Sequence, residues 1–440
     1  MGLLSFIGGI HPPHAKKASE KKAILKAIEP KIVRIPLRQH IGAPCDPAVK
    51  KGDYVKVGQE IGSVSSFVCA PIHSSVSGTV IDVKKVDVLG GQELCVIIES
   101  DGKNDLHESV QPKGELDSLE PKRIIEIIRD SGIVGMGGAG FPTHVKLSPP
   151  PEKAIETVIL NGAECEPYLT ADHRLMLESP EKIVFGLKAI MKAVGVEKGY
   201  IGIENNKPDA IEAMKVAAKG ENGIEVVGLH TKYPQGAEKQ LIYACTKREV
   251  PSGGLPMDAG AVVNNVATAA AVSDAIQLGM PSVERICTVT GSGIVDAQNL
   301  LIKVGTELSE IVDQCGGYKG TPGKVILGGP MMGIATHTDK IPSTKTTSGV
   351  LVFTPEEAKL PETVNCIKCG KCVEICPAFL QPAALSAYSL KGMYEQAEKI
   401  NALDCIECGS CSFVCPSKRP LLHSIRVGKR EVLAARRRSK

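Results

Sequence analysis

The chain has 440 residues and a formal net charge of +3, with 23 % charged and 43 % hydrophobic side chains, which is typical of a protein with several globular domains. Aromatic residues make up only 3 % of it, so neither a basic excess nor stacking side chains favour a nucleic-acid binder. Because no run approaches the ~18 consecutive apolar residues of a membrane helix, and the apolar start lacks the charged flank of a signal peptide, we expect a cytoplasmic chain without a transmembrane span.

The first hundred residues divide into two parts. Residues 1–30, rich in Pro, His and Lys, predict an N-terminal arm, extended at first and then a short helix. Residues 31–100 contain short β-type runs separated by Gly and Pro, which predict a small all-β domain. This part resembles the barrel-sandwich hybrid domain of biotinyl- and lipoyl-type proteins. Ile72 and His73 stand where that family has its carrier lysine, so the resemblance implies a scaffold and not a swinging arm.

After a polar linker, residues 121–285 alternate between helix-like and strand-like segments. Apolar residues 124–128 predict a helix, and residues 180–194 have helical periodicity. Residues 157–160 and 200–203 are candidates for buried strands. This alternation predicts an α/β domain with a largely parallel sheet.

Two segments of this domain indicate a ligand site. Residues 135–143 are rich in glycine, which lets backbone N–H groups approach a phosphate closely. They match neither the Rossmann nor the P-loop fingerprint, so an ordinary turn is an equally good interpretation of them alone. The polar residues 161–167, however, begin at the end of a predicted strand, where ligands of open α/β sheets bind.

These segments, together with residues 233–238 and 263–268, resemble the NADH- and FMN-binding 51-kilodalton subunit of respiratory complex I. The resemblance implies an FMN site made of Gly135, Gly137, Gly138, Ala139, Gly140, Lys146, Asn161, Glu164, Asn264, Asn265 and Thr268. It implies NADH contacts, the catalytic set, by Phe141, Glu166 and Glu238. Alanine replaces an acidic residue of the family pattern at positions 163, 237 and 267, which leaves an iron–sulfur relay protein without nucleotide activity as an alternative.

Residues 286–345 form a smaller predicted unit, with a strand at 286–290, a helix at 307–315 and a strand beginning at 324. From its position between the FMN/NADH-like domain and the cysteine-rich part, this unit is similar to the β-grasp domain called SLBB. A linker rich in Thr and Ser follows it.

Eight of the fifteen cysteines fall within residues 356–425, in two runs with the spacing C-x2-C-x2-C-x3-C followed by proline. This is the signature of two-cluster ferredoxins, in which the fourth cysteine of each run binds the other cluster. One [4Fe–4S] cluster is therefore assigned to Cys366, Cys369, Cys372 and Cys415, and the other to Cys405, Cys408, Cys411 and Cys376. Two Zn(Cys)4 sites are the alternative, but zinc ribbons normally use separated C-x2-C pairs. The segment between the runs predicts an all-helical domain.

The remaining features are less specific. Residues 426–440 form a basic tail that suits docking to partners or anionic lipid, although a solvated, disordered terminus is the simpler interpretation. The seven scattered cysteines, among them Cys45 and Cys69, are interpreted mostly as small buried apolar residues. Histidines 11, 14, 40 and 73 show no ligand spacing, so no histidine metal site is expected.

The order of arm, barrel-sandwich hybrid, Rossmann-like FMN/NADH domain, β-grasp unit and helical two-cluster domain resembles the RnfC family over essentially the whole chain, including residues 11–14 and 39–44. RnfC proteins are components of the Rnf complexes, which are membrane-associated, ion-translocating ferredoxin:NAD+ oxidoreductases. The resemblance implies an electron-transfer subunit on the cytoplasmic side of the membrane. Its partners would be the membrane and iron–sulfur subunits of the complex and, indirectly, ferredoxin. A soluble cobalamin reductase built from similar parts is the alternative enzyme.

Overall fold

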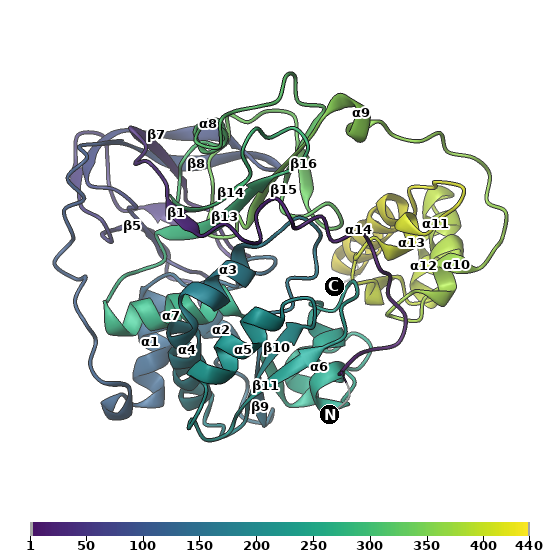
Figure 1. Cartoon of the computed structure of the whole chain (residues 1–440), viewed down its shortest axis with the longest axis horizontal. Helices are drawn as coiled ribbons and strands as arrows, with labels where there is room; N and C mark the ends of the chain where they lie inside the picture. The colour runs from purple at the N-terminus through teal and green to yellow at the C-terminus, as the bar shows by residue number, and fades with distance from the viewer. Residues whose placement is uncertain (1–2, 439–440) are drawn as a thin grey trace.

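The computed structural model describes residues 3–438 (Figure 1). Two β-rich parts and an α/β domain lie together, and the cysteine-rich helical unit stands at one side, joined to them by an extended segment that carries α9 (Pro355–Ala358). The N-terminal segment crosses the molecule and passes between the α/β domain and the helical unit. No helix within the described range is long and apolar enough to cross a membrane.

The expected all-β domain is present as two small sheets. One has the order β2-β8-β7-β4 and the other β3-β5-β6. Inward-facing aliphatic side chains such as Val33, Ile35, Ile61, Val96 and Ile98 form one core between them. The strands are β2 (Ile32–Pro36), β3 (Asp46–Pro47), β4 (Tyr54–Val55), β5 (Glu60–Ser63), β6 (Ile72–His73), β7 (Gly78–Val88) and β8 (Gly91–Ser100).

His73 on β6 is buried, with 6 % of its surface exposed, and its Nδ1 has no hydrogen-bond partner among the described residues. Burial therefore lowers its pKa from 6.5 to about 3. Between these values the unfolded chain binds a proton that the folded domain excludes, so stability is lost as the pH falls below 6.5. We expect this histidine to lower the free energy of unfolding by about 1.4 kcal/mol for each pH unit below 6.5.

The measurement is hydrogen exchange of the barrel strands in the full chain at pH 6.5 and pH 5. His73→Gln should make local opening less sensitive to acid than in the wild type, whereas His337→Gln, which alters an exposed histidine, should leave the wild-type dependence intact. Equal pH dependence in the wild type and the His73 variant would show that the imidazole is not held neutral by burial.

The predicted α/β domain is confirmed. Its sheet has the order β11-β10-β9-β12 with all pairs parallel, as expected for strands joined by helices. The strands are β9 (Thr157–Asn161), β10 (Gly199–Glu204), β11 (Ile224–Leu229) and β12 (Ala261–Asn265). The helices are α1 (Pro121–Asp130), α2 (Thr143–Lys146), α3 (Ala171–Glu178), α4 (Pro180–Val194), α5 (Pro208–Ala217), α6 (Glu238–Thr246) and α7 (Val266–Gln277), with short 3-10 turns at Leu116–Ser118 and Pro256–Ala259.

The long helices α4 and α7 pack unusually closely. A Cβ at Gly186 would lie 1.9 Å from the carbonyl oxygen of Ala269, so only glycine permits this approach. The close contact fixes α7, whose N-terminus begins at the end of β12 and supports the candidate site.

A second, mixed sheet has the order β1-β14-β13-β17-β15-β16. Its members are β1 (Ile24–Lys26), β13 (Glu284–Thr290), β14 (Gln298–Lys303), β15 (Lys324–Leu327), β16 (Ile334–Thr336) and β17 (Gly349–Phe353), with helix α8 (Leu308–Asp313) beside them. The predicted short helix in the arm is wrong, because β1 pairs in parallel with β14. The open edge of β14 offers backbone donors and acceptors, and pairing with them outweighs a weak local helical preference. The predicted range 286–345 also omits β1 and β17.

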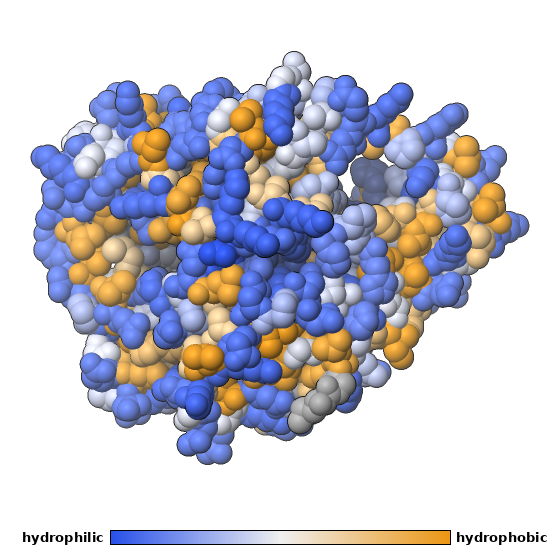
Figure 2. Space-filling view, in the orientation of Figure 1, coloured by the Kyte–Doolittle hydropathy of each residue, from blue (hydrophilic) through white to orange (hydrophobic). Residues whose placement is uncertain are grey.

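The cysteine-rich part is helical, as predicted. It contains α10 (Lys371–Glu374), α11 (Pro382–Leu390), α12 (Tyr394–Lys399), a 3-10 turn (Ala402–Asp404), α13 (Ser410–Phe413) and α14 (Leu421–Arg438). The expectation of a disordered basic tail is wrong for residues 426–438, which continue α14; residues 439–440 lie outside the described part. Val432 is buried, and a Cβ at Gly428 would lie 2.1 Å from Ser389 Oγ on α11, so packing against α11 orders the tail. In Figure 2 several apolar side chains gather over this unit.

Candidate functional site

The glycine-rich segment forms a closed loop pinned to the start of α7. Its ends pair through Gly135 N, which donates to the Phe141 carbonyl at 2.9 Å, and Met136 N donates to Thr268 Oγ1 at 3.0 Å. A Cβ at Gly137 would come within 2.9 Å of the Asn265 side chain, whereas one at Gly138 would meet no described atom within 4 Å. The loop therefore presents backbone with open space at Gly138, directly over the end of β12.

Two asparagines end β12 beneath this loop. The side chain of Asn265 accepts from Ala267 N at 2.8 Å, which caps α7, and donates to Asp172 Oδ2 at 2.7 Å. Asn264 is 4 % exposed, and its Nδ2 has no partner in residues 3–438. A buried amide donor without an acceptor is costly in a folded protein, so its position indicates a place for a polar ligand.

Lys146, at the end of α2, joins residues assigned to the two nucleotides. Its ammonium donates to Glu238 Oε1 at 2.8 Å and to the Val263 carbonyl at 2.8 Å. The predicted FMN lysine and the predicted NADH glutamate are therefore in direct contact, at the N-terminus of α6 and next to β12. Both side chains remain partly exposed, so they are accessible to a ligand.

The segment after β9 is engaged in several contacts. Asn161 Nδ2 donates to the Gly236 carbonyl at 2.8 Å. The Glu164 carboxylate accepts from the amides of Asp172 at 2.7 Å and His173 at 3.2 Å, so it caps α3. Two features were not predicted from the sequence: the ion pair of Glu164 with buried Lys16, 3.8 Å away, and the role of Asp172, whose pKa burial raises to about 6. No pattern in the sequence connects the arm to this loop.

Glu166 points toward the six-stranded sheet. Its carboxylate accepts from Met331 N at 3.0 Å and Met332 N at 2.8 Å, and burial raises its pKa. A Cβ at Gly329 would overlap it at 2.2 Å, so glycine is required there. The side chain of Phe141 is half-buried beside the loop. The three predicted NADH residues thus lie on different segments: Phe141 in the loop, Glu238 at the start of α6 and Glu166 after β9. The Glu166 carboxylate already accepts two hydrogen bonds from backbone amides.

Cysteines from the two runs come together at two places. Cys376 lies with the second run, in a cavity that it lines together with Cys405, Cys408 and Cys411. Burial, together with the neighbouring cysteines, Cys376 among them, raises the pKa of Cys411 to about 12 and that of Cys405 to about 11. In the first run, burial and then Cys369 and Cys415 raise the pKa of Cys372. Such thiols lose their protons only when a cation binds them. The resulting thiolates are the donor set that an iron–sulfur cluster requires.

The set around Cys376 is buried against the α/β domain. Tyr233, 1 % exposed, donates its hydroxyl to the Cys408 carbonyl at 2.8 Å, and Gln240 Nε2 donates to the Pro377 carbonyl at 3.0 Å. Ile10, Tyr233 and Cys408 share one small core. Cys366 and Cys369 of the other set are exposed. The roles of Tyr233 and Gln240 were not predicted from the sequence, although Tyr233 belongs to a segment that the family resemblance had singled out.

Three family models match the chain: the RnfC barrel sandwich hybrid domain over residues 4–103, the Nuo51 FMN-binding domain over 128–274 and the 4Fe-4S dicluster domain over 365–418. A chain of an NAD+-reducing [NiFe]-hydrogenase in its air-oxidized state is similar in fold, with a TM-score of 0.50 and 19 % identity over 75 % of this chain and 67 % of that one.

Curated relatives, each the subunit designated C of its complex, match the chain from end to end. The one from the Na(+)-translocating ferredoxin:NAD(+) oxidoreductase complex of Acetobacterium woodii is 52 % identical, over 99 % of this chain and 98 % of its own length. The one from the proton-translocating complex of Clostridium ljungdahlii is 50 % identical, over 100 % and 96 %. The one from the ion-translocating oxidoreductase complex of Rhodobacter capsulatus is 41 % identical, over 97 % and 82 %. The chain therefore belongs to the RnfC family, a component of the ion-translocating ferredoxin:NAD+ oxidoreductase complexes.

Proposed function

We propose that this chain is the NAD(H)-binding electron-transfer subunit of a membrane-associated ferredoxin:NAD+ oxidoreductase that moves Na+ or H+. In this role it passes electrons between NAD(H), FMN and two [4Fe–4S] clusters. The observation that carries the proposal is the contact between the Cys376 set and the α/β domain through Tyr233, which supports electron transfer between a cluster there and a flavin in that domain.

The residues around the glycine-rich loop fit FMN. The open backbone at Gly138, the unpartnered amide of Asn264 and the accessible ammonium of Lys146 supply donors for a phosphate or a flavin edge. We assign the wall behind them to the remaining members of the predicted FMN set: Gly135, Gly137, Ala139, Gly140, Asn161, Glu164, Asn265 and Thr268. When bound, FMN supplies the conversion between two-electron hydride transfer and one-electron transfer.

We assign the NAD(H) contacts to Phe141, Glu166 and Glu238. Glu238 is held toward the loop by Lys146, and Glu166 fixes the 329–332 turn as the opposite wall. In the helical unit, Cys376, Cys405, Cys408 and Cys411 would bind the inner cluster, and Cys366, Cys369, Cys372 and Cys415 the outer one. No side chain has to transfer a proton, because the chain's task is to position and shield its cofactors.

The six-stranded sheet with α8 supports the assignment of an SLBB β-grasp unit, extended beyond residues 286–345 by β1 and β17. The other proposed divisions are the N-terminal arm (1–30), the barrel-sandwich hybrid domain (31–100), the FMN/NADH domain (121–285), the two-cluster domain (356–425) and the basic tail (426–440). Cys366 and Cys369 of the outer set are exposed, as are Val364, Ile367 and Val373 near them in the chain. This favours that end as the contact with the iron–sulfur and membrane subunits, on the cytoplasmic side, and through them with ferredoxin.

The test is anaerobic purification of the chain, with iron, sulfide and flavin counted and visible spectra recorded as NADH is added. About eight irons, one FMN and bleaching of both chromophores by NADH are expected. Eight irons without flavin, or with flavin that NADH does not reduce, would overturn the nucleotide part and leave an electron relay. Zinc in place of iron in the cysteine runs would overturn the electron-transfer function itself.

A further inference from the structure

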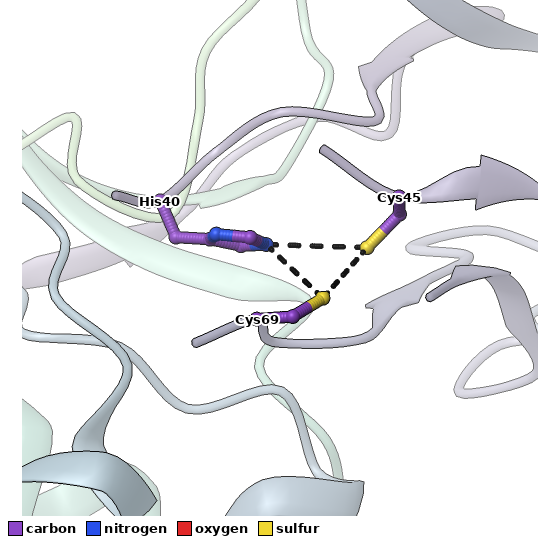
Figure 3. Close-up of side chains that lie close together, drawn as sticks. All are labelled: His40, Cys45 and Cys69. Carbon is purple, nitrogen blue, oxygen red and sulfur yellow. Dashed lines mark hydrogen bonds between the residues drawn. The ribbon is translucent and has the colours of Figure 1, made fainter. Parts of the chain in front are cut away.

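Three side chains from two loops of the barrel-sandwich part meet in its interior (Figure 3). His40 lies between β2 and β3, Cys45 immediately precedes β3, and Cys69 lies between β5 and β6. They are 7 %, 4 % and 4 % exposed. The two sulfur atoms are 3.5 Å apart, and His40 Nε2 is 3.9 Å from Cys45 Sγ and 3.8 Å from Cys69 Sγ. The expectation that no histidine takes part in a ligand-like cluster is therefore wrong.

These separations match those between the ligands of a tetrahedral zinc ion. With Zn–S bonds of about 2.3 Å and Zn–N bonds of about 2.0 Å, tetrahedral angles place two sulfurs about 3.8 Å apart and a nitrogen about 3.5 Å from each sulfur. The three observed distances differ from these values by less than about half an ångström. A cation would therefore be accommodated with only small side-chain shifts.

The histidine is oriented as a metal ligand would be. Its Nδ1 lies 3.2 Å from the Ile41 carbonyl oxygen, which needs a donor, so the proton belongs on Nδ1 and the lone pair of Nε2 faces the sulfurs. The Ala70 amide currently donates to Nε2 at 3.1 Å, and the Cys45 thiol donates to the Ala70 carbonyl at 3.4 Å. Burial lowers the pKa of His40, which keeps the ring neutral. The Ala70 amide must therefore release its hydrogen bond to His40 Nε2 before a metal can bind there.

The surrounding charge favours thiolates that share a cation. Buried Lys345 donates to the carbonyls of Pro71 at 2.8 Å and Gly132 at 2.7 Å. Burial lowers its pKa to about 8, and the nearby Cys45 and Cys69 oppose that shift. Burial, and then Cys69, raise the pKa of Cys45 to about 12, so the Cys45 thiol is protonated when no cation is present. A divalent ion would displace both thiol protons to solvent and leave a neutral site beside the lysine.

We propose that His40, Cys45 and Cys69 form a structural Zn2+ site with two sulfur ligands and one nitrogen ligand, its fourth position filled by water or the Ala70 carbonyl. The site stands directly behind the glycine-rich loop. Ile41 N donates to the Gly140 carbonyl at 3.3 Å, and Lys345 N donates to Gln39 Oε1 at 2.9 Å. The metal would thus fasten two barrel loops that support the loop assigned to FMN.

The test uses the full chain, purified anaerobically with its iron, supplied with zinc sulfate and then passed through a chelating column. Metal counting should find one zinc per chain, and zinc-edge X-ray absorption should show two sulfur neighbours at about 2.3 Å and nitrogen or oxygen neighbours at about 2.0 Å. Cys69→Ser should lose this zinc while it keeps the iron. Cys95→Ala, which alters another buried cysteine of the same domain, should keep both.

Two results would overturn the site. The first is wild-type chain that carries its full iron but no zinc, or zinc surrounded by four sulfurs, which would indicate misloaded cluster cysteines. The second is a peptide map showing a Cys45–Cys69 disulfide in protein kept anaerobic, which would make the pair a redox couple. Because zinc is counted separately from iron, flavin and NADH bleaching, failure of this site is distinguishable from failure of the proposed function.

Discussion

Cys376→Ser is expected to remove the inner cluster and to break the path from NADH to the outer one. Iron should fall from about eight to about four atoms per chain, because Cys376 completes the set with Cys405, Cys408 and Cys411. NADH should still reduce the flavin. Reduction of the remaining cluster by NADH should also become slower. Substitutions of residues that only contact a metal ligand typically cost ~10–100-fold, and this substitution removes a ligand itself, so we expect a larger effect. Rapid-mixing spectra after NADH addition measure both steps.

Cys415→Ser is the matched control, because it alters the corresponding cysteine of the other run. It should also cost about four irons, but from the outer set, so NADH should still reduce the remaining cluster quickly. If ligation did not cross between the runs, the two variants would exchange behaviours. That exchange would contradict the grouping of Cys376 with the buried cysteines.

Lys146→Met is expected to weaken FMN binding by about 10–100-fold. Hydrogen bonds to a charged group contribute about 1.5–3 kcal/mol, and about 1.4 kcal/mol corresponds to a factor of ten in the dissociation constant. The substitution also leaves the Glu238 carboxylate without its 2.8 Å partner beside an anionic ligand, which adds repulsion. Flavin released on dilution and the Kd from fluorescence titration measure the effect, and iron content should be unchanged.

Lys153→Met provides the control. Lys153 also forms an ion pair, 2.7 Å from Asp258, in the same domain but away from the glycine-rich loop. We expect wild-type FMN affinity in this variant, since exposed ion pairs contribute little. Equal loss of flavin in both variants would point to a general destabilisation of the domain, and unchanged flavin in both would remove Lys146 from the FMN site.

The two cysteine runs could be recognised from the sequence because the spacing within each run is local. Each run holds its cysteines two or three residues apart, and this geometry serves few purposes other than a cluster. The elements of the α/β domain were equally accessible, since apolar periodicity along residues 121–285 reports which face of each helix or strand is buried. The glycine-rich loop could be placed next to β12 only by resemblance, because nothing local connects residues 137 and 265.

Contacts between distant segments depended on the tertiary structure. The arm residues 24–26 become a strand because the edge of β14 is open to them, and residues 426–438 become helical because α11 offers Ser389 as a surface to pack on. The grouping of His40, Cys45 and Cys69 also depends on the folded barrel, since one loop contributes His40 and Cys45 and a second, distant loop contributes Cys69. The sequence by itself determined the local chemistry of this protein and the strongly periodic elements of its α/β domain. Which groups meet was decided by packing, because burial and strand pairing act between residues far apart in the chain.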